Sequence, residues 1–224
     1  MELQERHFAI LRRHMVEVIE IYVELSAREL GKPALDPRVL EALGRVPRHR
    51  FVPEMLQPFA YNNSPLPIGF DKTISQPFIV AVMTDLLELE PHSRVLEVGT
   101  GLGYHAAVLA ELVERVWTVE IIEELAASAE ERLAALGYGN VEIRVGDGSQ
   151  GWPEFAPFDR ILVTAAAEFV PAALLQQLAP GGRMVLPTGV PDDQKLSVVE
   201  KDRRGRTRIH EIMPVRFGEL ETVR

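Results

Sequence analysis

Short apolar runs alternate with helix-like stretches along most of the second half of the chain. The apolar runs are strand-like and lie at residues 94–98, 116–119, 141–145, 160–164 and 184–186. The stretches between them carry helical spacing, at residues 104–112, 122–136 and 171–178. Such alternation predicts βαβ units, in which helices cover both faces of a parallel sheet. Two final runs, 196–202 and 207–217, flank Arg203-Arg-Gly-Arg206 and predict an antiparallel hairpin.

The first part of the chain is predicted to be helical. Its apolar residues recur every three or four positions, the spacing of one helix face, and they are Phe8, Leu11, Met15, Val18, Tyr22 and Leu25. We expect this helix to end at Gly31 and to pack on its own domain, with a partner-binding helix as the alternative. Asp36 followed by Pro37 predicts a second helix, because aspartate caps helices and proline fits their first turn.

Residues 46–78 are rich in proline and glycine and show little periodicity. They predict a long loop, and a long loop inside a compact domain usually carries function. Pro77 then begins a further predicted helix. We therefore divide the chain into residues 1–78, with N-terminal helices and an active-site loop, and residues 79–224, the core of one continuous globular unit.

Composition narrows the expected partners. The net charge of −9 opposes attraction to a phosphate backbone, so no nucleic-acid partner is expected. The chain has no cysteine, which excludes disulfides and thiolate metal ligands, and its six histidines show no metal-ligand spacing. Because neither a signal peptide nor a membrane span is visible, we expect a cytoplasmic protein without a membrane partner. Nothing in the sequence demands an assembly, so a monomer is expected.

Three glycines, Gly99, Gly101 and Gly103, lie between the first predicted strand of the core and its helix. They allow a tight turn and a close approach of a ligand to the backbone. The spacing differs from the G-x-G-x-x-G of dinucleotide folds, and Glu97 precedes the turn, where a carboxylate would repel a pyrophosphate. S-adenosylmethionine carries a sulfonium and an ammonium group and no phosphate, so charge favours this cofactor over NAD or ATP.

Acidic residues also follow the next two predicted strands. Glu120 is placed to accept hydrogen bonds from ribose hydroxyls, and Asp147 to accept one from an adenine amino group. Each could instead be an ordinary turn residue or helix cap. Taken together, in this order, they favour a nucleoside site and predict a methyltransferase that uses S-adenosylmethionine.

Several longer motifs carry a resemblance to one family. They are Asp71-Lys-Thr-Ile-Ser-Gln-Pro77, Val95-Leu-Glu-Val-Gly-Thr-Gly-Leu-Gly-Tyr104, Gly146-Asp-Gly148, Pro157-Phe-Asp159, Val163-Thr-Ala-Ala166 and Pro180-Gly-Gly-Arg-Met-Val-Leu-Pro187. With these motifs the chain resembles the protein-L-isoaspartate O-methyltransferases over roughly residues 45–217. The glycine turn is shared by many methyltransferases, whereas the run Thr73-Ile-Ser-Gln-Pro77, preceded by Pro67-Ile-Gly69, is characteristic of this family.

The resemblance implies a seven-stranded class I, Rossmann-like methyltransferase sheet that ends in the antiparallel hairpin, with the N-terminal helices as an added layer. It also implies methyl transfer from S-adenosylmethionine to the α-carboxyl group of L-isoaspartyl residues in damaged proteins and peptides, without a metal. The products would be S-adenosyl-L-homocysteine and a methyl ester that starts repair through a succinimide. The alternatives are a methyltransferase of the same fold acting on RNA, a small molecule or another protein side chain, and a non-catalytic cofactor-binding module.

The resemblance also assigns residues. Ser75 matches the family's active-site serine, Glu120 its ribose ligand and Asp147 with Gly148 its adenine contact, while Arg48 and Phe51 match a Pro-Arg-x-x-Phe-Val-Pro segment. The candidate cofactor-binding residues are Ile74, Glu97, Gly99, Thr100, Gly101, Gly103, Glu120, Ile121, Asp147, Gly148 and Thr164. The candidate substrate-binding residues are Ile68, Thr73, Ser75 and Gln76. We expect Ser75 to orient the acceptor carboxylate by a hydrogen bond, although it could instead cap the helix that follows.

Overall fold

The computed structural model describes residues 2–223 and contains one seven-stranded sheet in the order β5-β4-β3-β6-β7-β8-β9. Its strands are β3 (Arg94–Val98), β4 (Arg115–Glu120), β5 (Val141–Val145), β6 (Phe158–Val163), β7 (Leu178–Val190), β8 (Asp193–Lys201) and β9 (Thr207–Val215). β3 to β7 are parallel, whereas β8 pairs antiparallel with β7 and with β9. The predicted doubly wound sheet and its C-terminal hairpin are confirmed.

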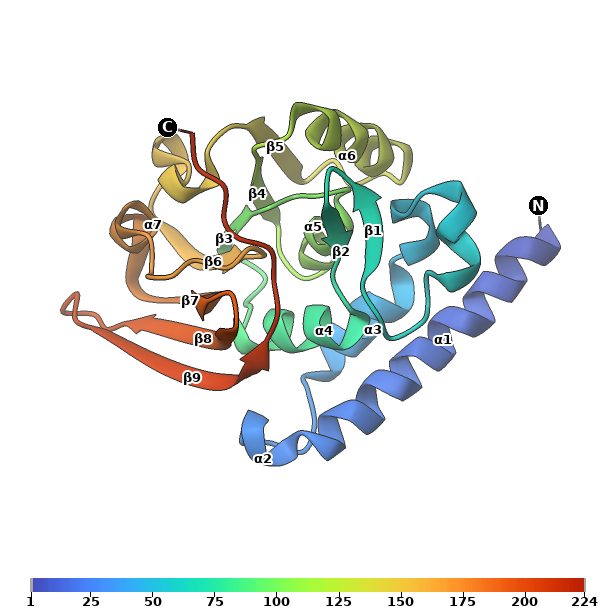
Figure 1. The fold of residues 1–224 in the computed structure, drawn as a ribbon, viewed down its shortest axis with the longest axis horizontal. Helices are drawn as coiled ribbons and strands as arrows, with labels where there is room; N and C mark the ends of the chain where they lie inside the picture. Colours follow the sequence, from blue (N-terminus) through green and yellow to red (C-terminus); the bar gives the residue numbers. More distant parts are fainter. Residues whose placement is uncertain (1, 224) are drawn as a thin grey trace.

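Helices cover both faces of this sheet (Figure 1). They are α4 (Pro77–Leu86), α5 (Tyr104–Ala110), α6 (Glu123–Ala135) and α7 (Ala172–Gln177). Neighbouring residues of one strand enter different buried clusters, because strand side chains alternate between the faces. On β3, Val95 joins the cluster that includes α4 and α5, and Leu96 joins the cluster that includes Leu174 of α7. Both faces of β3 are therefore covered, as is usual for a central strand of a parallel sheet.

The N-terminal helices are α1 (Glu2–Leu25), α2 (Ala27–Leu30) and α3 (Pro37–Arg45). Asp36 caps α3, since its side chain accepts a hydrogen bond from the backbone N–H of Arg38 at 2.9 Å, as predicted. The predicted single helix to Gly31 is wrong: α1 ends at Leu25, and Gly31 instead closes α2 with φ +69°.

The buried face of α1 also differs from the prediction in its second half. Phe8 and Met15 are buried as expected, but the stripe continues through Ile19 and Val23. Tyr22 and Leu25, predicted to pack, are 42% and 77% exposed. Both stripes have helical spacing, and only the position of α3 and α4 beside α1 selects between them.

Residues 46–78 hold regular structure where the sequence predicted a loop. Two 3₁₀ helices, η1 (Arg48–Phe51) and η2 (Glu54–Phe59), are followed by an antiparallel hairpin of β1 (Leu66–Gly69) and β2 (Lys72–Ile74). These elements have three to six residues each, too few to produce a periodic pattern.

The hairpin turns through Phe70 and Asp71, both with positive φ, of 53° and 55°. A single buried cluster contains residues from α1 and from β3, so the two parts of the predicted division share one core. The two parts divided at residue 78 therefore do not have a hydrophobic core each.

Candidate active site

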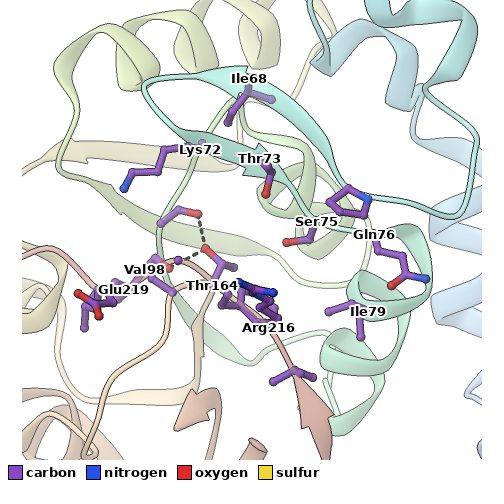
Figure 2. Close-up of a pocket in the computed structure, with 18 of the residues that line it drawn as sticks. Ile68, Lys72, Thr73, Ser75, Gln76, Ile79, Val98, Thr164, Arg216 and Glu219 are labelled. Carbon is purple, nitrogen blue, oxygen red and sulfur yellow. Dashed lines mark hydrogen bonds between the residues drawn. The ribbon is translucent and has the colours of Figure 1, made fainter. Parts of the chain in front are cut away.

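A cavity of about 740 Å³ lies at the carboxyl ends of the parallel strands, where doubly wound sheets bind ligands. One wall comes from the ends of β3, β4, β5 and β6, through Gly99, Glu120, Gly148 and Thr164. The other comes from the β1–β2 hairpin, the start of α4 and residues 213–221. Figure 2 shows Thr73 and Ser75 on one side of this space and Thr164 and Arg216 on the other. A volume of this size accommodates a drug-sized ligand.

The glycine turn is built against β6. Gly99 has φ +95°, and a Cβ atom there would lie 2.3 Å from the Oγ1 atom of Thr164. That hydroxyl lies 2.8 Å and 3.1 Å from the carbonyl oxygens of Gly99 and Val98, as drawn in Figure 2. Gly101 lines the cavity with φ +55°, while Gly103 is the N-cap residue of α5 and lies against Leu133 of α6. Positive φ and the close neighbouring atoms both favour glycine at these positions of the turn.

Glu120 brings a carboxylate to the cavity wall. Its two oxygens accept hydrogen bonds from the backbone N–H groups of Gly101 at 2.8 Å and Ile122 at 3.0 Å. An ionised carboxylate has about four acceptor positions, so Glu120 keeps capacity for a ligand's hydroxyl groups. Ile121, the next predicted residue, lines the same wall.

Asp147 is placed differently from its neighbour Gly148. Gly148 lines the cavity, whereas Asp147 lies outside the lining and accepts hydrogen bonds from the N–H groups of Ser149 at 2.9 Å and Val223 at 3.1 Å. Asp147 therefore caps the short 3₁₀ helix η3 (Gly148–Gln150), which was its alternative interpretation in the sequence.

Glu97 does not face the cavity, contrary to the charge argument made from the sequence. Its side chain is fully buried, and one oxygen accepts a hydrogen bond from Thr118 at 2.6 Å. Thr100, also buried, contacts the same Thr118 hydroxyl at 2.7 Å. Burial raises the pKa of Glu97 to about 8, so the group is mainly protonated at pH 7. Glu120 is therefore the carboxylate that a ligand meets at this wall.

The substrate candidates lie on β1, on β2 and in the residues that follow β2. Ile68, Thr73, Ser75 and Gln76 all line the cavity, whereas Ile74 lies outside its lining and is buried in the core. Alternation along an extended chain explains why Thr73 and Ser75 reach the cavity and Ile74 between them does not.

Ser75 does not cap α4, so that alternative is wrong. The capping residue is Gln76, and the N–H of Phe78 is bound instead by the side-chain oxygen of Asn63 at 3.0 Å. Within residues 2–223 the Ser75 hydroxyl has no hydrogen-bond partner, and it points into the cavity in Figure 2. This leaves the hydroxyl free to donate to a ligand.

Arg48 binds the backbone of Ser75 from the protein interior. The guanidinium is fully buried, and it donates to the carbonyl oxygens of Ser75 and Ala60, each at 2.8 Å. It also lies 4.7 Å from the ring centre of Tyr104, the first residue of α5 after the glycine turn. Burial lowers the pKa of Arg48 to about 10, so the group stays charged at pH 7. The sequence had marked Arg48 as part of a motif without showing this contact.

The C-terminal segment was not foreseen as part of the site. After β9 it crosses the carboxyl ends of the parallel strands (Figure 1), and residues 216–221 line the cavity. The backbone of Ala166 holds it through hydrogen bonds with Gly218 and Leu220, each at 2.8 Å. An ion pair between Lys72 and Glu221 joins it to the hairpin. No motif marks these residues, because their contribution depends on where β9 ends.

No helix within residues 2–223 has both the length and the hydropathy to cross a membrane. No group of three or more histidine or acidic side chains there has the arrangement of a metal site.

Comparisons with known proteins agree with the motifs. The sequence model of the family described as protein-L-isoaspartate(D-aspartate) O-methyltransferase matches residues 26–222. Protein-L-isoaspartate O-methyltransferase 1 of Polaromonas sp. strain JS666 is 54% identical over 219 residues, which cover 98% of this chain and 93% of the relative. The protein of the same name from Nitrosospira multiformis is 59% identical over 219 residues, with 97% and 90% covered.

Two solved structures share the fold. A protein-L-isoaspartate O-methyltransferase superposes with a TM-score of 0.76 at 27% identity, covering 93% of this chain and 65% of the solved one. A candidate β-aspartate methyltransferase from Plasmodium falciparum, solved with S-adenosyl-L-homocysteine, also gives 0.76, at 23% identity with 94% and 98% covered. Since the family match and the relatives extend over most of the chain, this protein belongs to the protein-L-isoaspartate(D-aspartate) O-methyltransferase family.

Proposed function

We propose that the chain transfers the methyl group of S-adenosylmethionine to the α-carboxyl group of L-isoaspartyl residues in damaged proteins and peptides. The observation that carries this proposal is the free Ser75 hydroxyl, which shares one cavity with the glycine turn and Glu120. The resulting methyl ester re-forms a succinimide spontaneously, and hydrolysis returns part of it to normal aspartate. The protein thereby begins repair.

The wall formed by the strand ends suits the cofactor. The backbone of Gly99 and Gly101 lines the cavity and can lie close to a ligand, Glu120 accepts from the ribose hydroxyls, and Ile121 and Gly148 flank the base. Asp147 remains the proposed acceptor for the adenine amino group, because its carboxylate keeps free lone pairs beside its two backbone bonds. Thr164 supports the turn through its hydroxyl.

Behind this wall, Glu97, Thr100 and Gly103 shape the turn, and Ile74 anchors β2 in the core.

On the opposite wall, Ser75 donates a hydrogen bond that aims the substrate carboxylate, and Thr73, Ile68 and Gln76 shape its surroundings. The cofactor supplies a methyl group on a positively charged sulfur. The acceptor carboxyl has an ordinary pKa near 4 and is ionised at pH 7, so no general base is needed. Positioning is then the main task of the protein, and it can lower a barrier by roughly 7–11 kcal/mol.

The setting we propose is the cytoplasm, with damaged proteins as the partners of a monomer that binds neither nucleic acid nor membrane. The net charge of −9 and the lack of cysteine support this setting.

One pair of peptides tests the activity. The same sequence is made with an isoaspartyl and with a normal aspartyl residue, and each is incubated with the protein and labelled cofactor. We expect base-labile methyl ester on the isoaspartyl peptide alone. Calorimetric binding of S-adenosyl-L-homocysteine without turnover of either peptide would instead indicate the cofactor-binding module, and equal turnover of both would contradict isoaspartyl specificity.

A further inference from the structure

The cavity extends past Ser75 to the end of α1. Tyr22 of α1 and Ser26, which follows that helix, both line it. Tyr22 lies outside residues 26–222, the part matched by the family's sequence model. It is also a residue for which the sequence predicted burial and the structure shows 42% exposure. An aromatic side chain left open on the wall of a catalytic cavity is available to a ligand.

The position of Tyr22 is set by the packing of α1 and by a ring contact. The buried face of α1 holds the helix through Ile19 and Val23, residues on either side of it along the helix. Its ring lies 5.7 Å from the ring of Phe78, at an interplanar angle of 47°. Phe78 is only 4% exposed and stands three residues after Ser75. The Tyr22–Phe78 pair is therefore connected to Ser75 through the first turn of α4.

Further apolar side chains line the cavity with the aromatic pair. Ile79 of α4 lies beside the pair, and Met213 and Pro214 of β9 line the same cavity. α2 packs beside β9, which brings the end of the N-terminal helices to this strand. Ser26, Gln76 and Arg216 line the same cavity, but the aromatic pair, Ile79, Met213 and Pro214 carry no charge and together favour an apolar or aromatic group over a charged one.

This end of the cavity is continuous with the space beside Ser75, so the substrate peptide bound there is the ligand that can reach it. An extended peptide advances about 3.3 Å per residue, so side chains one or two positions from the isoaspartyl residue lie within reach of the aromatic pair. We propose that Tyr22, with Phe78, Ile79, Met213 and Pro214, forms a subsite for an apolar or aromatic side chain one or two residues from the isoaspartyl residue of the substrate. This subsite rests on the proposed function and adds a preference for particular residues next to the isoaspartyl residue.

The test compares isoaspartyl peptides that differ only at the flanking positions, with glycine, leucine or phenylalanine at each in turn. The wild-type protein is expected to prefer leucine or phenylalanine at one such position, through a lower KM. Tyr22→Ala should reduce kcat/KM for that preferred peptide about five-fold, the size expected for losing one aromatic contact, and leave the glycine peptide unchanged. Tyr22→Phe should keep the preference, because it retains the ring.

Ile21→Ala is the matched control, since Ile21 is a neighbouring apolar residue that is 55% exposed and lies outside the cavity lining. It should leave every peptide unchanged. Equal wild-type kcat/KM for all flanking residues, or an equal loss on all peptides in Tyr22→Ala, would overturn the subsite while the methyltransferase activity stands. If wild-type protein methylates none of the isoaspartyl peptides, the proposed function fails and the subsite with it.

Discussion

Replacing Arg48 by methionine tests how Ser75 is held in position. Methionine keeps an unbranched apolar stem but removes the donors that bind the carbonyl oxygens of Ser75 and Ala60. Each of these two carbonyl oxygens costs about 1–3 kcal/mol when it loses its donor, and removal of the buried cation offsets part of the summed cost. We therefore expect a net loss of about 1–3 kcal/mol in the free energy of unfolding.

The kinetic effect should exceed the effect on cofactor binding. Ser75 shares the cavity with the cofactor wall, and a displacement of about 1 Å in a reacting group can lower a rate about 100-fold. We expect kcat for an isoaspartyl peptide to fall between about 10- and 100-fold in Arg48→Met, with the affinity for S-adenosyl-L-homocysteine nearly unchanged. Initial rates measure kcat, calorimetry measures the affinity for S-adenosyl-L-homocysteine, and thermal unfolding measures the stability. Arg48→Lys should restore only part of kcat, because an ammonium group lacks the planar fork that reaches both carbonyls.

Arg160→Met is the control for a general effect on stability. Arg160 also donates to a backbone carbonyl, that of Glu88, at 3.0 Å, and burial likewise lowers its pKa, but it lies outside the cavity lining. Its replacement should lower stability and leave kcat unchanged. If both variants lower kcat equally, or if cofactor affinity falls in parallel with kcat in Arg48→Met, then Arg48 does not act by positioning Ser75.

Three further substitutions test other parts of the site. Ser75→Ala should lower kcat/KM for an isoaspartyl peptide by about 10-fold or more, the value of one hydrogen bond to a charged group, with unchanged calorimetric affinity for S-adenosyl-L-homocysteine; wild-type turnover would remove Ser75 from the mechanism. Gly99→Ala should abolish that affinity, since its Cβ would lie 2.3 Å from the Thr164 Oγ1 atom and an alanine at φ +95° costs about 1–2 kcal/mol; a tight-binding variant would show that the turn is not the cofactor site. Glu97→Gln should remove a pH dependence of the free energy of unfolding, measured by denaturant titration without cofactor. Because the pKa of Glu97 rises from 4.5 to about 8 on folding, the native state binds the extra proton and wild-type stability falls as pH increases between these values, by up to about 1.4 kcal/mol per pH unit. Parallel pH profiles for the two proteins would contradict this.

The sheet and the glycine turn were predictable because their signals are local. A parallel strand covered on both faces is mostly apolar, and a turn with positive φ selects glycine, so both are visible in a short stretch of sequence. The cap at Asp36 was predictable for the same reason, since it depends only on the next two residues. The short elements between residues 46 and 78 were missed, because a three-residue strand has no period to detect.

Which side chains reach the cavity was decided by tertiary structure. The sequence places Glu97 beside the turn, but the direction of its side chain depends on the pleat of β3, which points it at Thr118 and away from the cavity. Tyr22 fits either of two faces of α1, and the neighbouring helices bury Ile19 and Val23 in its place.

The local sequence therefore determined the fold class and the glycine turn, because each follows from the conformational preferences of a few adjacent residues. Only the folded chain could bring Arg48 to the Ser75 carbonyl or lay residues 216–221 across the cavity. Those contacts join residues 27 positions or more apart, and their energy depends on distance and burial in space rather than on separation along the chain.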